Sequence, residues 1–267
     1  MLPRTDWDDL PASVRTAVQA RTGPVASAGT VPAGMNSAMA VVLRTSDGHV
    51  FVKGLRHDHP GVITQQREAA VNPYLRGIAP RLLWRIDAGG WNLLGFEHLA
   101  GRHADYAPGL ADLPLVIDAM RRLSEIPCPP VPHVKCAEQR WAAYADNQAD
   151  LASFCGLSLL HTDFNPCNVL ITGGGARIID WAWPTRGAAW IDPASLVLRL
   201  MAAGHSPAQA ETWASALPAW ITVPARAVTA FARSGSRLWD QIACDDPQPW
   251  KLQMAANARE WARYRSW

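Results

Sequence analysis

The sequence lacks three features that would place it in a special class: a long hydrophobic run, a block of like charges and a paired cysteine motif. Its longest apolar stretches, at 194–203 and 214–223, contain arginine, proline or polar residues and fall short of the roughly 20 residues that a membrane span needs. The 25 basic and 23 acidic side chains give a formal net charge of +2, which offers little attraction to nucleic acid or an anionic membrane. We therefore expect no membrane and no nucleic-acid partner.

Five cysteines are scattered along the chain, and no two of them have the C-x-x-C spacing. This pattern predicts neither a disulfide framework nor a zinc site. The first ten residues carry acids and a tryptophan instead of a basic segment before an apolar core, so no secretory signal is expected. Apolar residues make up 49% of the chain and charged residues 18%, as in globular proteins. We expect a globular protein that stays in the cytoplasm.

The first hundred residues have the pattern of an antiparallel sheet with one helix, after a short leading helix within residues 1–22. Runs at 39–45 and 49–55 are β-like and are separated by Ser-Asp-Gly, a strong hairpin signal. Residues 62–77 have a helical pattern that Pro73 threatens. Two more strands are predicted at 81–86 and 91–97, on either side of an Ala-Gly-Gly turn.

The rest of the chain is mainly helical and rich in tryptophan, with one compact β-like insert at 159–179. The helices are predicted at 113–125, 137–154, 194–203, 207–216, 224–243 and 249–265. The change of pattern near residue 100 predicts an α+β fold with two lobes. Residues 1–99 form a small lobe with an antiparallel sheet and one helix, and residues 100–267 form a larger, mainly helical lobe.

The insert contains the sharpest motif of the sequence, H-x-D-x-x-x-x-N from His161 to Asn168, followed by an apolar strand that leads to Asp180. Phosphoryl transfer requires charge neutralised on the phosphates and an acceptor hydroxyl that is aligned and relieved of its proton. Asn168 and Asp180 offer the hard oxygen ligands that Mg²⁺ prefers. Asp163 is then the group that faces the acceptor hydroxyl.

This pattern resembles the aminoglycoside phosphotransferase and choline kinase group, relatives of protein kinases, over nearly the full chain. The resemblance implies a protein-kinase-like fold, with Asp163 as catalytic base and Asn168 and Asp180 as Mg²⁺ ligands. It also implies that His161 packs to shape the loop. Asp192, in Asp-Pro-Ala, corresponds to a family residue that braces the catalytic segment.

The resemblance extends to the first lobe, where the family has a phosphate-binding lysine on a strand and a glutamate on the following helix. Lys53 and Glu68 occupy such positions, and an ion pair between them would hold the lysine toward the nucleotide phosphates. The remaining candidates for nucleotide binding are Asn36 and Ser37 in the loop before the first hairpin, and Phe96, Glu97 and Leu99 at the hinge between the lobes.

Several features bear on the acceptor. Thr162 stands where the family usually has glycine, and Trp181-Ala182 stands where protein kinases have Phe-Gly, which favours a small molecule over a protein substrate. Trp181, Trp183 and Trp190 either line the acceptor pocket or belong to the core. Residues 100–267 contain 15 basic and 15 acidic side chains. This even balance weakens the interpretation of a polycationic aminoglycoside as the acceptor.

The sequence therefore predicts an enzyme that moves the γ-phosphate of ATP or GTP, with Mg²⁺, to a hydroxyl of a small molecule. An antibiotic, with a role in resistance, and a hydroxylated metabolite both stay open as acceptor, as do a monomer and a homodimer. The leading alternative is a nucleotide-binding pseudokinase with a regulatory or scaffold role, but Lys53, Asp163 and Asp180 are all retained. A hydrolytic metal site at His161 is disfavoured because no histidine pair has the i, i+4 spacing.

Overall fold

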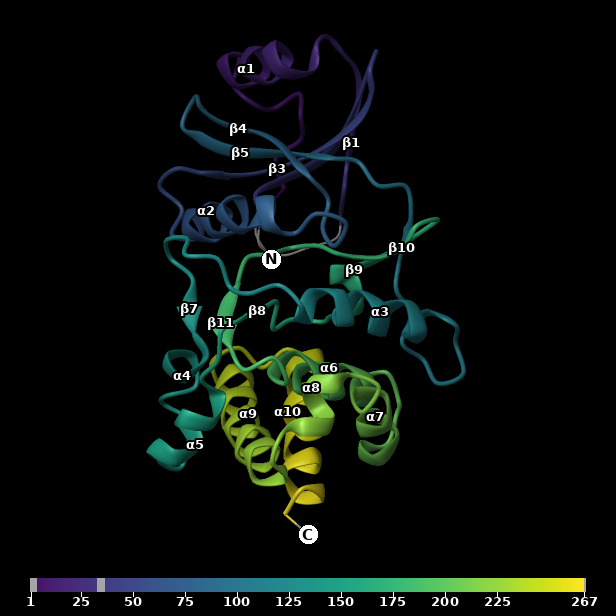
Figure 1. Ribbon diagram of the computed structural model, residues 1–267. Coiled ribbons are helices and arrows are strands. Elements are labelled where there is room, and N and C mark those ends of the chain that lie inside the picture. The colour runs from purple at the N-terminus through teal and green to yellow at the C-terminus, as the bar shows by residue number, and fades with distance from the viewer. Residues whose placement is uncertain (1–3, 33–36, 267) are drawn as a thin grey trace. The chain divides into compact units, whose positions relative to one another are not determined.

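The computed structural model describes residues 4–32 and 37–266, which divide into two compact units (Figure 1). The first unit runs up to Arg102 and adds Val131–His133 and Arg177–Ala182. The second unit comprises His103–Pro130, Val134–Ala176 and the chain from Trp183 on. A single boundary between residues 99 and 100 does not describe this division, because the segment that carries Asp180 groups with the first unit.

The first unit contains a five-stranded antiparallel sheet in the order β1-β2-β3-β5-β4. Its strands are β1 (Val25–Thr30), β2 (Met39–Thr45), β3 (Gly48–Arg56), β4 (Leu82–Ala88) and β5 (Trp91–Glu97). The predicted hairpin is present, with Met39 opposite Gly54 and Thr45 opposite Gly48. Strand β1 was not predicted from the sequence, because this edge strand is almost entirely exposed and lacks the apolar alternation that reveals a half-buried strand.

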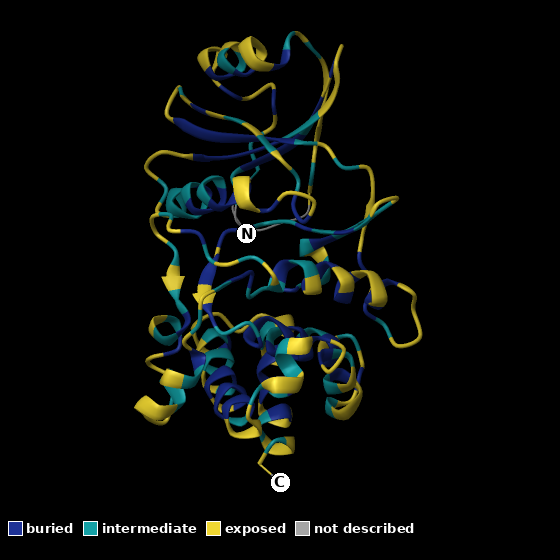
Figure 2. Cartoon of the chain, in the orientation of Figure 1, coloured by how far each residue is buried: buried dark blue, intermediate teal, exposed yellow. Residues whose placement is uncertain are grey.

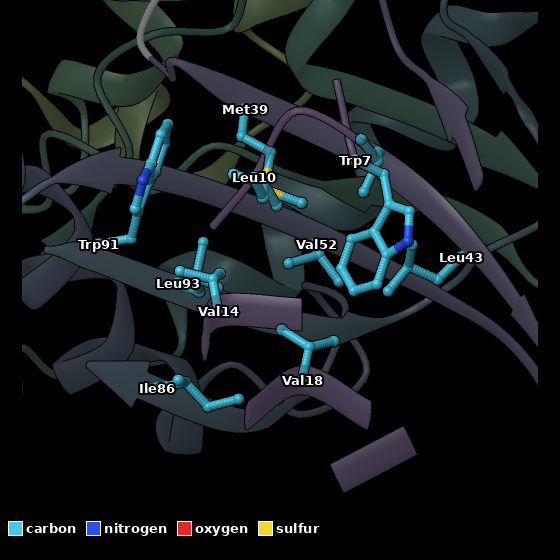
Figure 3. Packing of buried hydrophobic residues seen from close by; sticks show 11 residues of the cluster. Trp7, Leu10, Val14, Val18, Met39, Leu43, Val52, Ile86, Trp91 and Leu93 are labelled. Carbon is cyan, nitrogen blue, oxygen red and sulfur yellow. The ribbon is translucent and has the colours of Figure 1, made fainter. Parts of the chain in front are cut away.

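A hydrophobic core joins helix α1 (Ala12–Thr22) to one face of this sheet, and Figure 3 shows how its side chains lie. Val14 and Val18 are four residues apart and therefore project from the same side of α1. Both are fully buried and pack with Trp7, Leu10, Met39, Val41, Leu43, Val52, Ile86, Trp91 and Leu93. Each such side chain contributes about 1.5–3 kcal/mol by its removal from water, so this core fixes the strand on which Lys53 lies.

Helix α2 (Val62–Val71) packs against β3 and β5. It ends before Pro73, and a 3₁₀ turn (Asn72–Tyr74) continues the chain, because proline cannot donate the hydrogen bond that the helix would need there. The predicted helix to residue 77 was therefore too long. The buried side of α2 includes Glu68, which is thereby turned toward the sheet.

The second unit is built mainly of helices, and Figure 2 shows that the long ones have separate buried and exposed sides. They are α3 (Asp112–Ser124), α4 (Ala137–Arg140), α5 (Gln148–Phe154), α6 (Ile191–Ala202), α7 (Pro207–Ala214), α8 (Pro218–Thr222), α9 (Ala225–Asp245) and α10 (Pro249–Tyr264). The single helix predicted at 137–154 was wrong, since α5 starts afresh with Asn147 accepting a hydrogen bond from the Asp150 N–H. None of the helices described is long and apolar enough to cross a membrane.

Short strands frame the motif loop. They are β6 (Arg102–His103), β7 (Lys135–Cys136), β8 (Ser158–Leu160), β9 (Val169–Thr172), β10 (Gly175–Ile178) and β11 (Thr185–Gly187). Within the second unit β11 pairs with both β7 and β8. Strand β8 leads directly into the motif, which ends in a 3₁₀ turn (Pro166–Asn168). The hairpin of β9 and β10 then carries the chain to Asp180, as the sequence indicated.

Candidate active site

Lys53, on β3, forms the charged centre of the first unit. Its Nζ lies 2.5 Å from Oε2 of Glu68 and 3.2 Å from Oδ1 of Asp180. The Lys53 and Glu68 side chains are only 10% and 6% exposed, and the ammonium lies 5.9 Å from the centre of the Phe96 ring. The structure thus places the two predicted first-lobe residues in a direct, buried ion pair and adds Asp180 to it.

Neighbouring charges shift the pKa values of Lys53 and Glu68. Burial alone would lower the pKa of Lys53, but the charges of Glu68 and Asp180 outweigh it and raise the pKa well above its usual value. Burial raises the pKa of Glu68, while the Lys53 charge opposes this rise. Two carboxyl groups share one ammonium, so with both ionised one negative charge is not compensated by Lys53. Such a cluster fits a site that receives a further cation.

Three further features accompany this cluster. Asp180 has a φ of 61°, the left-handed region that aspartate tolerates better than most residues and that is common at functional sites. The next residue, Trp181, donates its indole N–H to the carbonyl of Ile178 at 3.1 Å. Gln65, three residues before Glu68 on α2, is 2% exposed, and neither atom of its amide has a partner among the residues described. Sequence reasoning did not single out Gln65.

In the second unit, the motif brings Asp163 and Asn168 into contact. The amide nitrogen of Asn168 donates to the Asp163 carboxylate at 3.0 Å and to its backbone carbonyl at 3.1 Å. Because the nitrogen makes both bonds, the amide oxygen is left as an acceptor, the atom that a hard cation would use. The loop therefore orients the predicted base and a predicted metal ligand together.

Arg199, on α6, is a site residue that sequence reasoning missed. Its Nη2 donates to the Asp163 carboxylate at 2.6 Å, and its side chain is 13% exposed. The guanidinium also lies 5.5 Å from the ring of Trp239. The only signal in the sequence was that a lone arginine interrupts the apolar stretch at 194–203, which indicates a buried charge that needs a partner.

Asp192, at the start of α6, holds the entry of the loop. Its carboxylate accepts the backbone N–H groups of His161 at 3.0 Å and Thr162 at 2.9 Å. The His161 ring accepts the N–H of Asp163 at 3.3 Å through Nδ1 and packs against Phe164, with ring centres 5.5 Å apart. Both residues thus contact the backbone of the loop that leads to Asp163, and their part in catalysis stays a prediction.

We expect the protonation of Asp192 to make stability and activity change with pH in opposite directions. Burial raises its pKa from 3.8 to about 6, although the His161 and Thr162 N–H groups oppose the rise. Since the folded state binds this proton more tightly than the unfolded state, the stabilising contribution is complete below pH 3.8 and is lost as pH rises through 6. The change is on the order of 3 kcal/mol. Activity should fall below pH 6, because the proton then occupies a carboxylate oxygen of Asp192 that accepts a backbone N–H of the loop.

Urea unfolding of the wild type and of Asp192→Asn between pH 4 and 7, with kcat measured over the same range, checks this. Asparagine does not titrate, so the variant should lack this component of the pH dependence. Identical unfolding curves across the range in both proteins would contradict the assignment to Asp192.

The other predicted nucleotide-binding residues have structural contacts of their own. The Phe96 side chain is buried, and the Glu97 carboxylate accepts the N–H of Arg81 at 2.9 Å. The carbonyl of Ser37 accepts from Arg4 at 2.5 Å, and Leu99 is half-buried. Asn36 lies outside the described residues. Contact of these residues with a nucleotide stays a prediction.

The predicted acceptor pocket requires a correction. Trp181 is 1% and Trp190 is 7% exposed, so neither side chain presents a surface to an acceptor. Trp190 packs in an aromatic cluster, with ring centres 6.0 Å from Phe154 and 5.6 Å from Phe231. Trp183 alone of the three is exposed, at 43%. The other two are core residues, the alternative that the sequence had left open.

Solved structures of low sequence identity share the fold over almost the whole chain. Choline kinase LicA from Streptococcus pneumoniae superposes with a TM-score of 0.66 at 12% identity, covering 94% of this chain and 99% of that one. A thermostable mutant of aminoglycoside phosphotransferase APH(4)-Ia gives 0.63 at 15% identity, with 93% and 98% covered. Macrolide 2'-phosphotransferase MphH from Brachybacterium faecium gives 0.55 at 17% identity, with 92% and 97% covered. The predicted protein-kinase-like fold is confirmed.

The sequence comparison identifies the family. No curated protein matches the chain with significance. The profile described as the phosphotransferase enzyme family matches residues 96–231, just over half of the sequence. This segment contains Asp163, Asn168, Asp180 and Asp192. The chain therefore belongs to the phosphotransferase enzyme family and is a phosphotransferase that acts on hydroxyl groups.

Proposed function

We propose that the protein transfers the γ-phosphate of ATP, bound with Mg²⁺, to a hydroxyl of a small molecule. The observation that carries the proposal is the buried contact of Lys53 with Glu68 and Asp180, in a chain whose Asp163 and Asn168 are also held together. Charged and polar groups in such arrangements are costly to bury. Their presence at the family motifs supports a catalytic role over a structural one.

Each residue has a role that its contacts support. Lys53, held charged and in place by Glu68, binds the nucleotide phosphates. Asp163, oriented by Asn168 and Arg199, accepts the proton of the acceptor hydroxyl. A base of this kind must be fixed within hydrogen-bond reach of the proton that it removes, and the donors on its carboxylate, which include the Asn165 N–H, provide that fixation.

The donor set fits Mg²⁺. Asp180 supplies a carboxylate, which contacts the same Lys53 ammonium as Glu68 does. Asn168 supplies an amide oxygen. Magnesium keeps most of its waters and needs only one or two carboxylates from the protein. When bound, the ion neutralises phosphate charge; Asp180 and Asn168 would hold it.

Charge near the base favours some acceptors over others. Relatives in the same fold are solved with hygromycin B and with spectinomycin. Here the guanidinium of Arg199 adjoins the carboxylate of Asp163. An ammonium group of the acceptor beside Asp163 would be repelled by this guanidinium, because like charges repel at short range. We infer that the acceptor carries no cluster of ammonium groups beside the reacting hydroxyl, as in a neutral antibiotic or a hydroxylated metabolite.

Coupled ADP release, measured with ATP and with GTP across macrolides, peptide antibiotics, aminoglycosides, amino alcohols and sugars, tests the proposal. We expect one acceptor class to raise ADP release above the acceptor-free rate, EDTA to abolish it, and mass spectrometry to detect a product heavier by one phosphoryl group. If nucleotide raises Tm while no acceptor is phosphorylated, the protein is a nucleotide-binding pseudokinase instead.

A further inference from the structure

The residue before the predicted base has a backbone conformation that its side chain disfavours. Thr162 has a φ of 67°, and the structure gives a positive φ to only two other non-glycine residues in the part that it describes, His133 and Asp180. A β-branched residue in the left-handed region is a true outlier, whereas glycine adopts it without steric penalty. Some contact must therefore hold Thr162 in place.

Arg140 supplies such a contact. Its Nη1 donates to the Thr162 hydroxyl at 2.6 Å and to the Thr185 hydroxyl at 2.6 Å. The same nitrogen lies 3.3 Å from the carbonyl oxygen of Trp183. One guanidinium nitrogen thus joins the motif loop to β11, and we call Arg140, Thr162 and Thr185 the arginine clamp.

The two ends of the clamp are anchored independently of Thr162. Thr185 is fully buried and lies opposite Leu160 in the pairing of β11 with β8, two residues before Thr162. Arg140 is the last residue of α4, and its guanidinium lies 5.0 Å from the Trp141 ring and 6.0 Å from the Trp183 ring. Stacking on two indoles limits the rotamers of a long side chain and so pre-organises its hydrogen bonds.

We propose that Arg140 is a positioning residue, which keeps Thr162 in the left-handed conformation and thereby fixes the direction of Asp163. The effect on catalysis rests on the proposed function of Asp163; the effect on the loop does not. The threonine hydroxyl gives Arg140 a hydrogen-bond partner that glycine lacks. Arginine and threonine together therefore replace the conformational freedom of glycine at this position.

The proposal predicts that the effect of substituting Arg140 depends on whether residue 162 is threonine or glycine. Arg140→Met keeps an unbranched chain over the indoles but removes the hydrogen bonds, so the loop should relax and kcat should fall by about tenfold to a hundredfold. KM for ATP should change little. In Arg140→Met/Thr162→Gly, glycine accepts the left-handed conformation without the clamp, so kcat should return to the value of Thr162→Gly alone.

Hydrogen exchange of the amides at 160–164 provides a readout without turnover. Exchange should quicken in Arg140→Met and return to the wild-type rate in the double variant, with Tm following the same order. Arg237→Met is the matched control: that guanidinium also donates to a backbone carbonyl of the second unit, Tyr144 O at 2.6 Å, but does not touch the loop. It should leave kcat and loop exchange unchanged.

Equal losses of kcat and of loop protection in the single and double variants would overturn the proposal, because Arg140 would then act only through packing. If Arg140→Met does not fold, Arg140→Lys replaces it in the same cycle, since an ammonium cannot reproduce the geometry of the guanidinium. If the wild type phosphorylates no acceptor but the exchange cycle shows rescue by Thr162→Gly, the proposed function fails and the clamp stands.

Discussion

Lys53→Met is expected to abolish measurable phosphoryl transfer and to destabilise the fold. The substitution removes the ammonium that Glu68 and Asp180 share and leaves the 6% exposed Glu68 side chain without its ionic partner. Removal of one partner from a buried pair costs about 3–5 kcal/mol. Urea unfolding followed by circular dichroism measures the loss.

The loss of stability should depend on pH in a direction set by Glu68. Without Lys53, burial raises the pKa of this carboxyl with no ammonium to oppose it. The folded variant then prefers the protonated acid, so its stability is greatest below the unfolded pKa and falls as pH rises through the folded one. The destabilisation by Lys53→Met should therefore be larger at pH 8 than at pH 5.

The double variant Lys53→Met/Glu68→Gln separates stability from catalysis. A neutral amide removes the unpaired buried charge, so unfolding free energy should recover in large part while activity stays absent. An unfolding free energy of the single variant equal to that of the wild type would show that the Lys53–Glu68 contact is not the buried pair described above. Recovered activity in the double variant would show that Lys53 does not bind the phosphates.

Local sequence patterns predict much of the fold. The hairpin of β2 and β3 follows from alternating apolar residues around Asp47-Gly48, and it places Lys53 on an inner strand. Two features were not predicted from the sequence. Strand β1 was missed because it is a polar edge strand. The break between α4 and α5 was missed because the cap at Asn147 lies inside a continuous helical pattern.

In the candidate site, too, the sequence reveals residues of a local motif but not partners that are distant along the chain. Asp163 and Asn168 are five residues apart, so a motif reveals them together. Arg199 reaches Asp163 from 36 residues away and Arg140 reaches Thr162 from 22 residues away, and no local periodicity encodes such tertiary partners. The burial of Trp181 and Trp190 was likewise a tertiary outcome, because tryptophan suits both a core and a ligand surface.

Asp163→Asn should lower kcat with the correct acceptor by about 10²–10⁴-fold, the usual contribution of general acid–base catalysis. The amide is nearly isosteric and keeps an oxygen for Arg199, but it cannot take up the hydroxyl proton. Because Lys53, Glu68 and Asp180 are unaffected, the rise of Tm with nucleotide should persist. A fall in kcat with preserved nucleotide binding is therefore the signature of a lost base.

Asp118→Asn is the matched control for this variant, since Asp118 also pairs with arginine, at 3.2 Å from Arg122, but is 57% exposed on α3. Its kcat should equal that of the wild type. Wild-type turnover by Asp163→Asn would remove Asp163 from the reaction and leave Arg199 binding a structural carboxylate. A loss of both turnover and nucleotide binding would instead mean that the Arg199 contact supports the loop as a whole, because a missing base alone leaves nucleotide affinity unchanged.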